Sequence, residues 1–274
     1  MSRYIFTITA GRSGQVSLTE VINRAAINCH AEVEYPEIKP FFKGVLTKYE
    51  YKLRRKFIET NELLGRGDVL TSFVKNDISY LADIAKKKKT LIDTLLGDES
   101  RAYFDVGKHF SRGLHLGFDQ ILESYSLVLL VRDPMENILS FIRRNKNFYL
   151  DNNHPSDPVN CYVYIKDSYT PVELYAWIWV ETYLRFLSMI KSDKVISYHV
   201  LHTQDLDKRA KIMELFEVLG IKGDFHDFQA IRMNTSNTHD AQLTNDEKKQ
   251  FFSFVSNLPV QILNEIPIIK KYFQ

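Results

Sequence analysis

The sequence predicts an α/β protein in which helices flank a central, mainly parallel sheet. Residues 4–9 have the composition of a strand, and they run through a glycine-containing loop into a helix. Residues 126–131 form a continuous apolar run, typical of a strand covered on both faces, and a helix start follows directly. Strands and helices that alternate in this way favour a parallel sheet with its ligand site at the carboxyl ends of the strands.

The first strand leads into a loop with the pattern of an anion cradle. Gly11 and Gly14 lie three residues apart, and from Ser17 onward apolar residues recur at helical spacing. Glycines allow backbone N–H groups to turn toward an anion, and the positive N-terminus of the next helix points at the same place. The segment therefore predicts a phosphate site, although the same pattern also occurs in ordinary strand-to-helix connections.

Residues 38–95 are expected to form a helical insertion over the ligand edge of the sheet. Apolar residues recur at spacings of three and four in residues 39–64 and 72–96, and the glycines at 65 and 67 interrupt the pattern between them. We expect the substrate pocket or a lid to be built here. The run Lys86–Lys89 inside the insertion is interpreted as a solvated helix face.

The second strand-to-helix connection places charged and hydroxyl side chains at the same edge. Asp133, Pro134 and Glu136 have the pattern of the N-cap, N1 and N3 positions, so the helix begins directly after the strand. Arg132 then lies at the C-terminal end of a buried strand, where open α/β sheets bind their ligands. Ser140 lies two helical turns further on, where its hydroxyl can face the same crevice.

The second half of the chain continues with further helices and one more strand. Thr170 and Glu173 form a capping box that begins a long aromatic helix, which ends at about Ile190. We expect a strand over residues 194–201, a helix over 207–219, and two later helices that begin after Thr244 and after Pro259.

Composition bounds the class of protein. The chain has 274 residues, 45% of them hydrophobic, and no linker-like segment, so we expect a single domain over residues 1–274. Its 36 basic and 34 acidic residues give a net charge of +2, which argues against a nucleic-acid surface. The two cysteines form neither a disulfide framework nor a metal set.

Because no stretch approaches about 18 apolar residues, we expect a cytoplasmic protein without a membrane span. The oligomeric state is not indicated.

Together, the two connections resemble the sulfotransferases that use 3′-phosphoadenosine 5′-phosphosulfate (PAPS). In that family an Arg/Lys-Ser-Gly-Thr-Thr loop holds the 5′-phosphosulfate, and an Arg-Asp-Pro strand end with a later Ser holds the 3′-phosphate. Gly11-Arg12-Ser13-Gly14 is similar to the first motif, and Val131-Arg132-Asp133-Pro134 with Ser140 is similar to the second. The likeness covers residues 3–36, 101–145 and 194–240, and it implies a P-loop-like sulfotransferase architecture.

The resemblance also implies which residues contact the nucleotide. Arg132 and Ser140 would hold the 3′-phosphate, and a late loop with Asn234 and Ser236 would close over it. The loop departs from the family at Gln15 and Val16, where hydroxyl residues are usual, so Ser17 is the hydroxyl expected near the sulfate. The residues implied for the 5′-phosphosulfate are Gly11, Arg12, Ser13, Gly14, Gln15, Val16 and Ser17.

The implied activity is transfer of a sulfuryl group from PAPS to a hydroxyl or amine of a small-molecule or carbohydrate acceptor, which leaves adenosine 3′,5′-bisphosphate (PAP). Negative charge grows on the nucleotide's bridge oxygen as its bond to sulfur breaks, and we assign Arg12 as the cation that stabilises it. The acceptor also needs a base. Glu34 is the leading candidate because it follows the expected second strand near the crevice, and Glu32, His109 and His30 are alternatives. No metal is required.

Two other functions stay open at this point. A P-loop kinase would carry Gly-x-x-x-x-Gly-Lys-Ser/Thr, whereas here Gly11 and Gly14 are too close together and no Lys follows them. In that reading Asp133 would serve as the magnesium-binding carboxylate at the strand end. A nucleotide-binding relative that has lost catalysis is compatible with the departure at Gln15 and Val16.

Overall fold

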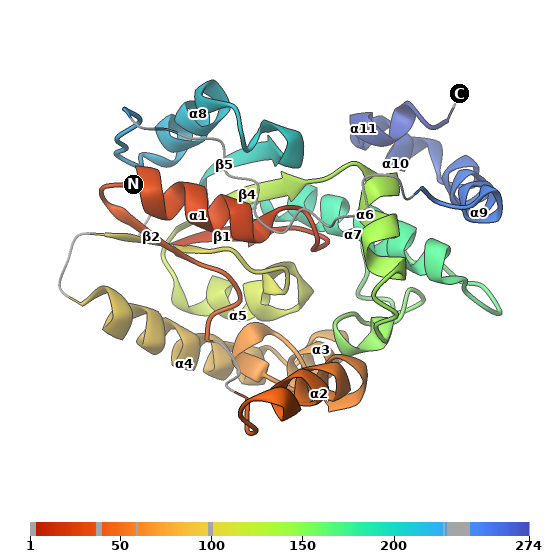
Figure 1. The fold of residues 1–274 in the computed structure, drawn as a ribbon, viewed down its shortest axis with the longest axis horizontal. Coiled ribbons are helices and arrows are strands. Elements are labelled where there is room, and N and C mark those ends of the chain that lie inside the picture. The colour runs from red at the N-terminus through yellow and green to blue at the C-terminus, as the bar shows by residue number, and fades with distance from the viewer. Residues whose placement is uncertain are drawn as a thin grey trace.

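Five parallel strands form the central sheet, in the spatial order β2-β3-β1-β4-β5 (Figure 1). The computed structural model describes residues 4–36, 40–58, 60–97, 101–226, 228 and 242–273, so Asn234 and Ser236 lie outside the described residues. The α/β class is confirmed, and all five carboxyl ends meet at one edge. The strands are β1 (Tyr4–Ile8), β2 (Cys29–Glu32), β3 (Ala102–Asp105), β4 (Tyr125–Val131) and β5 (Val195–His202).

Helices cover both faces of the sheet, and each face has its own apolar core (Figure 1). In β1 the side chains alternate between the two cores, because Ile5 is buried in one and Phe6 in the other. Every residue of β4 is buried, as its continuous apolar run predicts. One face is covered by α1 (Gln15–Ala25) and α8 (Arg209–Leu219), and the other by α4 (Ile78–Leu96), α5 (Leu114–Ile121) and α7 (Pro171–Met189).

Most of the described residues between β2 and β3 are helical. Figure 1 shows α2, α3 and α4 on the side of the sheet that also carries α5. Before α4 this stretch contains α2 (Val45–Leu53), the π-helical turn η1 (Arg54–Ile58), the 3₁₀ turn η2 (Glu62–Leu64) and α3 (Asp68–Val74).

One expectation for this stretch is wrong: the run Lys86–Lys89 is not simply a solvated face. Lys88 is buried, and its Nζ lies 2.5 Å from Oδ2 of Asp105 at the end of β3. Lys86 and Lys89 instead pair with acidic side chains of α4 itself. Which lysine of the run reaches Asp105 depends on how α4 packs against the sheet. The lysine run alone could therefore not reveal this ion pair.

Three of the other helices begin where their capping residues predict, whereas α8 begins at Arg209, two residues later than expected. Asp133 caps α6 (Pro134–Ile142) by accepting hydrogen bonds from the two amides of its first turn. Thr170 and Thr244 form capping boxes at the starts of α7 and of α9 (Asn245–Ser256). Across the ranges that the structure describes, no helix combines the length and the apolar character needed to cross a membrane. The other elements are η3 (Phe110–Arg112), η4 (Phe148–Leu150), η5 (Thr203–Asp205), α10 (Val260–Glu265) and α11 (Pro267–Lys270).

Candidate functional site

The glycine loop between β1 and α1 has a backbone that most residues do not adopt. Gly11, Arg12 and Gly14 have φ angles of +94°, +58° and +86°. A Cβ at Gly14 would also lie 2.8 Å from Cδ1 of Leu206, so a larger residue would have to displace this side chain in addition to straining the backbone. Gly14 is the N-cap of α1 and provides no side-chain cap, so no N-cap side chain stands in front of the first-turn amides of the helix. An anion at the loop would meet these amides at the positive end of the helix.

Side chains from three other segments hold this loop in place. Asn137 of α6 donates from Nδ2 to O of Gly11 at 2.6 Å. Thr203, which directly follows β5, donates from Oγ1 to O of Ser13 at 2.7 Å. Thr9 accepts the amide of Gly11 on its Oγ1 at 3.2 Å. None of these three side chains could be predicted from the sequence, because each acts on the loop through tertiary contacts.

Arg12, Arg132 and Ser140 meet beside the loop, although the chain separates them widely. Nε of Arg12 donates to Oγ of Ser140 at 3.2 Å, and Nη1 of Arg132 donates to O of Arg12 at 3.2 Å. Arg132 also pairs with Glu136 in the first turn of α6, with Nε and Oε2 3.1 Å apart. Nε1 of Trp179 donates to O of Arg132 at 3.0 Å, so the buried aromatic helix α7 fixes the end of β4.

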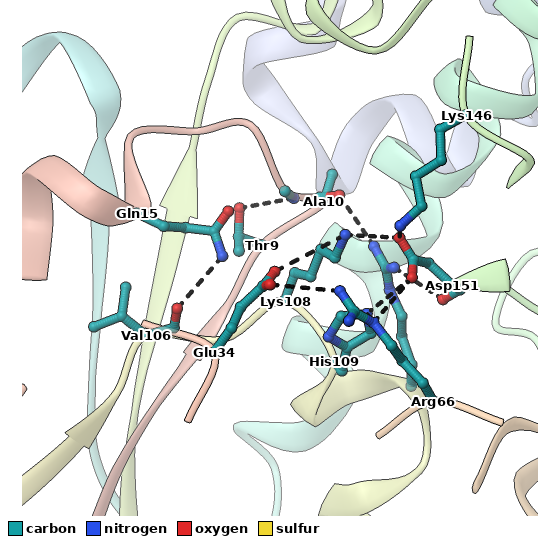
Figure 2. Close-up of polar contacts among 12 residues, drawn as sticks. Thr9, Ala10, Gln15, Glu34, Arg66, Val106, Lys108, His109, Lys146 and Asp151 are labelled. Atoms are coloured by element: carbon teal, nitrogen blue, oxygen red, sulfur yellow. Dashed lines mark hydrogen bonds and ion pairs between the residues drawn. The ribbon is translucent and has the colours of Figure 1, made fainter. Parts of the chain in front are cut away.

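The remaining loop side chains point elsewhere. Ser13 is buried, and its hydroxyl donates to O of Gly11 inside the loop. Gln15 donates from Nε2 to O of Val106 at 3.4 Å, which turns its amide toward the end of β3 (Figure 2). Ser17 is buried in the first turn of α1, and Val16 is half-buried. In this arrangement the backbone of the loop offers more to an anion than the side chains of residues 13 to 17 do.

A cluster of charged residues lies on the other side of Gly11. We call it the Asp151 cluster, and it consists of Asp151, Glu34, Arg66, Lys108, Lys146, His109 and Arg112. Oδ2 of Asp151 lies 2.7 Å from Nζ of Lys108 and also contacts Nζ of Lys146, and Oδ1 lies 3.1 Å from Nε of Arg66. Figure 2 shows Glu34 and Asp151 approaching Lys108 from opposite sides.

Both carboxylates of the cluster are held in the ionised form. Burial would raise the pKa of Asp151, but the charge of Lys108 and the neighbouring His109 and Lys146 hold that pKa well below its usual value. The pKa of Glu34 is also lowered. Burial acts to raise its pKa, and the charges of Lys108, with Nζ 4.0 Å away, and of Arg66, with Nη2 3.4 Å away, outweigh that effect.

Glu34 is the most accessible of the candidate bases within the cluster. Its side chain is 34% exposed, and its φ of +51° is a left-handed backbone conformation that costs energy for a residue with a Cβ. His109 is only 2% exposed, and burial together with the charge of Arg66 holds its pKa well below the usual value. Nε2 of His109 faces Arg66 and Asp151, so its ring is engaged within the protein. Glu32 and His30 pair with each other at 3.0 Å on β2.

The Asp151 cluster carries more positive than negative charge. Arg112 is buried and links it to the loop, because Nη1 donates to O of Asp151 at 2.9 Å and Nη2 donates to O of Ala10 at 3.0 Å. The side chain of Lys108 packs against Gly11, where a Cβ would lie 3.0 Å from Cδ of the lysine. Four cations thus surround two carboxylates. A buried surplus of charge is costly unless an opposite charge balances it, so this arrangement favours an anionic ligand.

Asp133 does not face the loop with a free carboxylate. Its Oδ1 accepts the first-turn amides of α6, and its Oδ2 accepts hydrogen bonds from Nζ of Lys271 at 2.6 Å and from the hydroxyl of Tyr272 at 2.5 Å. These partners hold the pKa of Asp133 below its usual value against the opposing effect of burial. The carboxylate therefore caps α6 and anchors the C-terminal helix.

Comparisons with known proteins add one likeness. No protein-family model matches the chain, and no curated protein does. Among solved structures, the fold is similar to the sulfotransferase domain from the Synechococcus PCC 7002 olefin synthase, at 15% sequence identity and a TM-score of 0.43. The likeness covers 93% of this chain and 94% of that chain.

Proposed function

We propose that this protein transfers a sulfuryl group from PAPS to a hydroxyl or amine of a small-molecule or carbohydrate acceptor. The observation that carries the proposal is the meeting of Arg12, Arg132 and Ser140 beside the glycine loop. PAPS has two anionic ends, and the site offers donors for both. The first-turn amides of α1 suit the 5′-phosphosulfate, and the guanidinium groups with the Ser140 hydroxyl suit the 3′-phosphate.

The charge of the site fits such a donor substrate. The surplus of cations in the Asp151 cluster lies next to Gly11, so a sulfuryl group at the loop would contribute the negative charge that balances it. Planar guanidinium groups bind phosphate oxygens two at a time, which favours Arg12 and Arg132 over lysines at the nucleotide end. Arg12 has its Nε at Ser140, so we expect it to contribute to nucleotide binding as well as to charge stabilisation.

In the proposed reaction the acceptor atom attacks sulfur. The new bond to sulfur forms as the bond from sulfur to the bridging phosphate oxygen breaks, and PAP leaves with the electron pair. Glu34 takes the acceptor proton, since it is ionised, partly exposed and at the edge of the Asp151 cluster. Lys108 lies between Glu34 and Gly11, where its ammonium can stabilise negative charge that develops beside the loop.

A P-loop kinase is less well supported. Gln15 occupies the place after the second glycine where the phosphate-binding lysine of that class is expected, and its amide is turned to Val106. Both oxygens of Asp133 have partners within the protein. Neither residue is therefore available in the role that the kinase reading gives it.

The experiment that tests the proposal measures PAP release from PAPS in the presence of hydroxyl-bearing and amine-bearing acceptors. We expect release that depends on the acceptor and is lost in the Arg132→Ala variant. Binding of PAPS without turnover across the acceptor classes would favour a catalytically inactive relative. Release of ADP from ATP with magnesium would favour the kinase.

A further inference from the structure

Residues 41–57 form a surface on which apolar side chains point to solvent. Phe41 is 83% exposed and Val45 is 78% exposed, and they belong to a contiguous stretch of chain. Large apolar surfaces of this kind usually mark a site of interaction. We call this surface the 41–57 face. Its exposed apolar residues are Phe41, Phe42, Val45, Leu46, Tyr49, Leu53 and Phe57.

A buried carboxylate fixes this arrangement. Glu50 is the buried residue of α2, the reverse of the usual pattern in which a surface helix buries its apolar side. Its carboxylate accepts the amides of Phe41 and Phe42 at 2.9 and 2.8 Å, and it accepts Nε of Arg54 at 2.7 Å. The turn that carries the two phenylalanines is therefore held against α2 by hydrogen bonds. The two side chains are exposed although their backbone is fixed in place.

The net charge of the 41–57 face is positive. Residues 43–56 contain six Lys or Arg residues and one acidic residue, the inward-facing Glu50. Lys48 and Lys52 lie four residues apart on α2, as Val45 and Tyr49 do, so a row of cations runs alongside a row of apolar side chains. The exposed lysines of the segment are Lys43, Lys48, Lys52 and Lys56.

We propose that the 41–57 face docks on a membrane surface that contains anionic lipids. Helices that lie in the membrane interface combine aliphatic and aromatic side chains with flanking Lys and Arg, and basic residues near anionic headgroups strengthen the attachment. A protein partner matches the face less well, because lysine is depleted at protein–protein interfaces. Figure 1 shows α2 at the edge of the molecule, where such a surface can reach it.

The face is joined to the candidate site. Asn61, just after this segment, donates from Nδ2 to O of Pro36 at 3.2 Å, two residues after Glu34. The amide of Arg66 donates to O of Asn61 at 3.2 Å. These two contacts link the residues just after the 41–57 face to the Glu34 side of the candidate site. The docking itself does not depend on the proposed sulfuryl transfer.

Co-sedimentation with lipid vesicles tests the proposal. We expect the protein to bind vesicles of phosphatidylcholine with phosphatidylglycerol and to bind pure phosphatidylcholine vesicles at least about tenfold more weakly, because several cations face the surface. Val45→Ser with Tyr49→Ser should lower binding to the anionic vesicles by about tenfold or more. Lys48→Glu with Lys52→Glu should have a similar effect, since each cation near such a surface contributes about fivefold.

Matched variants elsewhere on the surface separate docking from general changes in polarity or charge. Ile27 and Val260 are each 64% exposed, so Ile27→Ser with Val260→Ser is the apolar control, and Lys86→Glu with Lys249→Glu is the charge control. Both controls should bind like the wild type. Equal binding to neutral and anionic vesicles, or unchanged binding in both 41–57 variants, would overturn the proposal. Self-association that the Val45 and Tyr49 substitutions abolish, without vesicle binding, would assign the face to a second copy of this chain.

Discussion

Arg12 donates a hydrogen bond from Nε to Oγ of Ser140 at 3.2 Å, across 128 residues of sequence. Arg12 comes from the glycine loop after β1, and Ser140 lies two turns into α6 after β4. The contact joins the two segments that the sequence marks as anion-binding, because β1 and β4 are neighbours in the sheet and end at the same edge. The proposed nucleotide site rests on this relationship.

Loss of the donors at this contact should weaken PAP binding. Arg132→Ala and Ser140→Ala each remove a hydrogen bond to the charged 3′-phosphate, which is worth about 1.5–3 kcal/mol. Arg12→Ala should lower both PAP affinity and turnover, because its Nε is at Ser140. Calorimetric titration measures these changes. Arg143→Ala, at an exposed arginine just past α6, is the control that should leave affinity unchanged. Equal affinity in the wild type and the Arg132 variant would remove the 3′-phosphate assignment.

Glu34→Gln should lower turnover by roughly 10²–10⁴ while PAP affinity is kept, because a general base contributes about that much. Glu32→Gln is the matched control, since that carboxylate pairs with His30 on β2. The comparison is made at saturating PAPS with an acceptor that responds. Near-normal turnover in Glu34→Gln together with a collapse in His109→Ala would transfer the role to the histidine.

The pH dependence of kcat/KM should show a flat region between about pH 6 and 8. Lys108 and Arg66 hold the pKa of Glu34 below its usual value against the effect of burial, so the base is ionised throughout this range and is lost only at more acidic pH. Burial and the charge of Lys108 lower the pKa of Lys146 to about 8, so the cluster loses a cation above that pH and binds the donor less well. Lys146→Arg should move the alkaline limb upward. An acid limb close to neutral pH would contradict Glu34 as the base.

Asp151→Asn should destabilise the fold by about 3–5 kcal/mol, because it leaves buried cations without their counter-charge. Glu20→Gln, at an exposed pair with Arg24, should cost no more than about 0.5 kcal/mol. The lowered pKa of Asp151 also determines how its contribution to folding stability changes with pH. Its stabilisation is present above the unfolded-state pKa and is lost as pH falls through the folded-state pKa. Denaturant unfolding at neutral and acid pH measures both effects, and equal losses in the two variants would contradict the role given to Asp151.

The sequence was informative where the signal is local. The glycine spacing, the Asp133 cap and the continuous apolar strand can each be recognised within a short stretch of sequence. The structure has a loop, a helix start and a buried strand at those places. The contact between Arg12 and Ser140 follows from two such signals, since parallel strands share their carboxyl edge.

The Asp151 cluster could not be found in the same way. Arg66 comes from the helical insertion, Lys108 from the turn after β3, and Asp151 from the loop after η4. They meet through tertiary contacts such as the two hydrogen bonds by which Arg112 joins Ala10 to Asp151. The spacing of residues along the sequence does not predict such tertiary contacts. Of this cluster, the sequence indicated only Glu34 and His109, which were expected as candidate bases near the carboxyl ends of the strands.

Titration of the protein with PAP, and separately with ATP and magnesium, tests the nucleotide assignment most directly. PAP at 100 times its dissociation constant should stabilise the fold by about 2.7 kcal/mol, seen as a rise in melting temperature that Arg132→Ala reduces. ATP with magnesium should give no comparable rise. A clear rise with ATP and magnesium while PAP leaves the melting temperature unchanged would contradict the account.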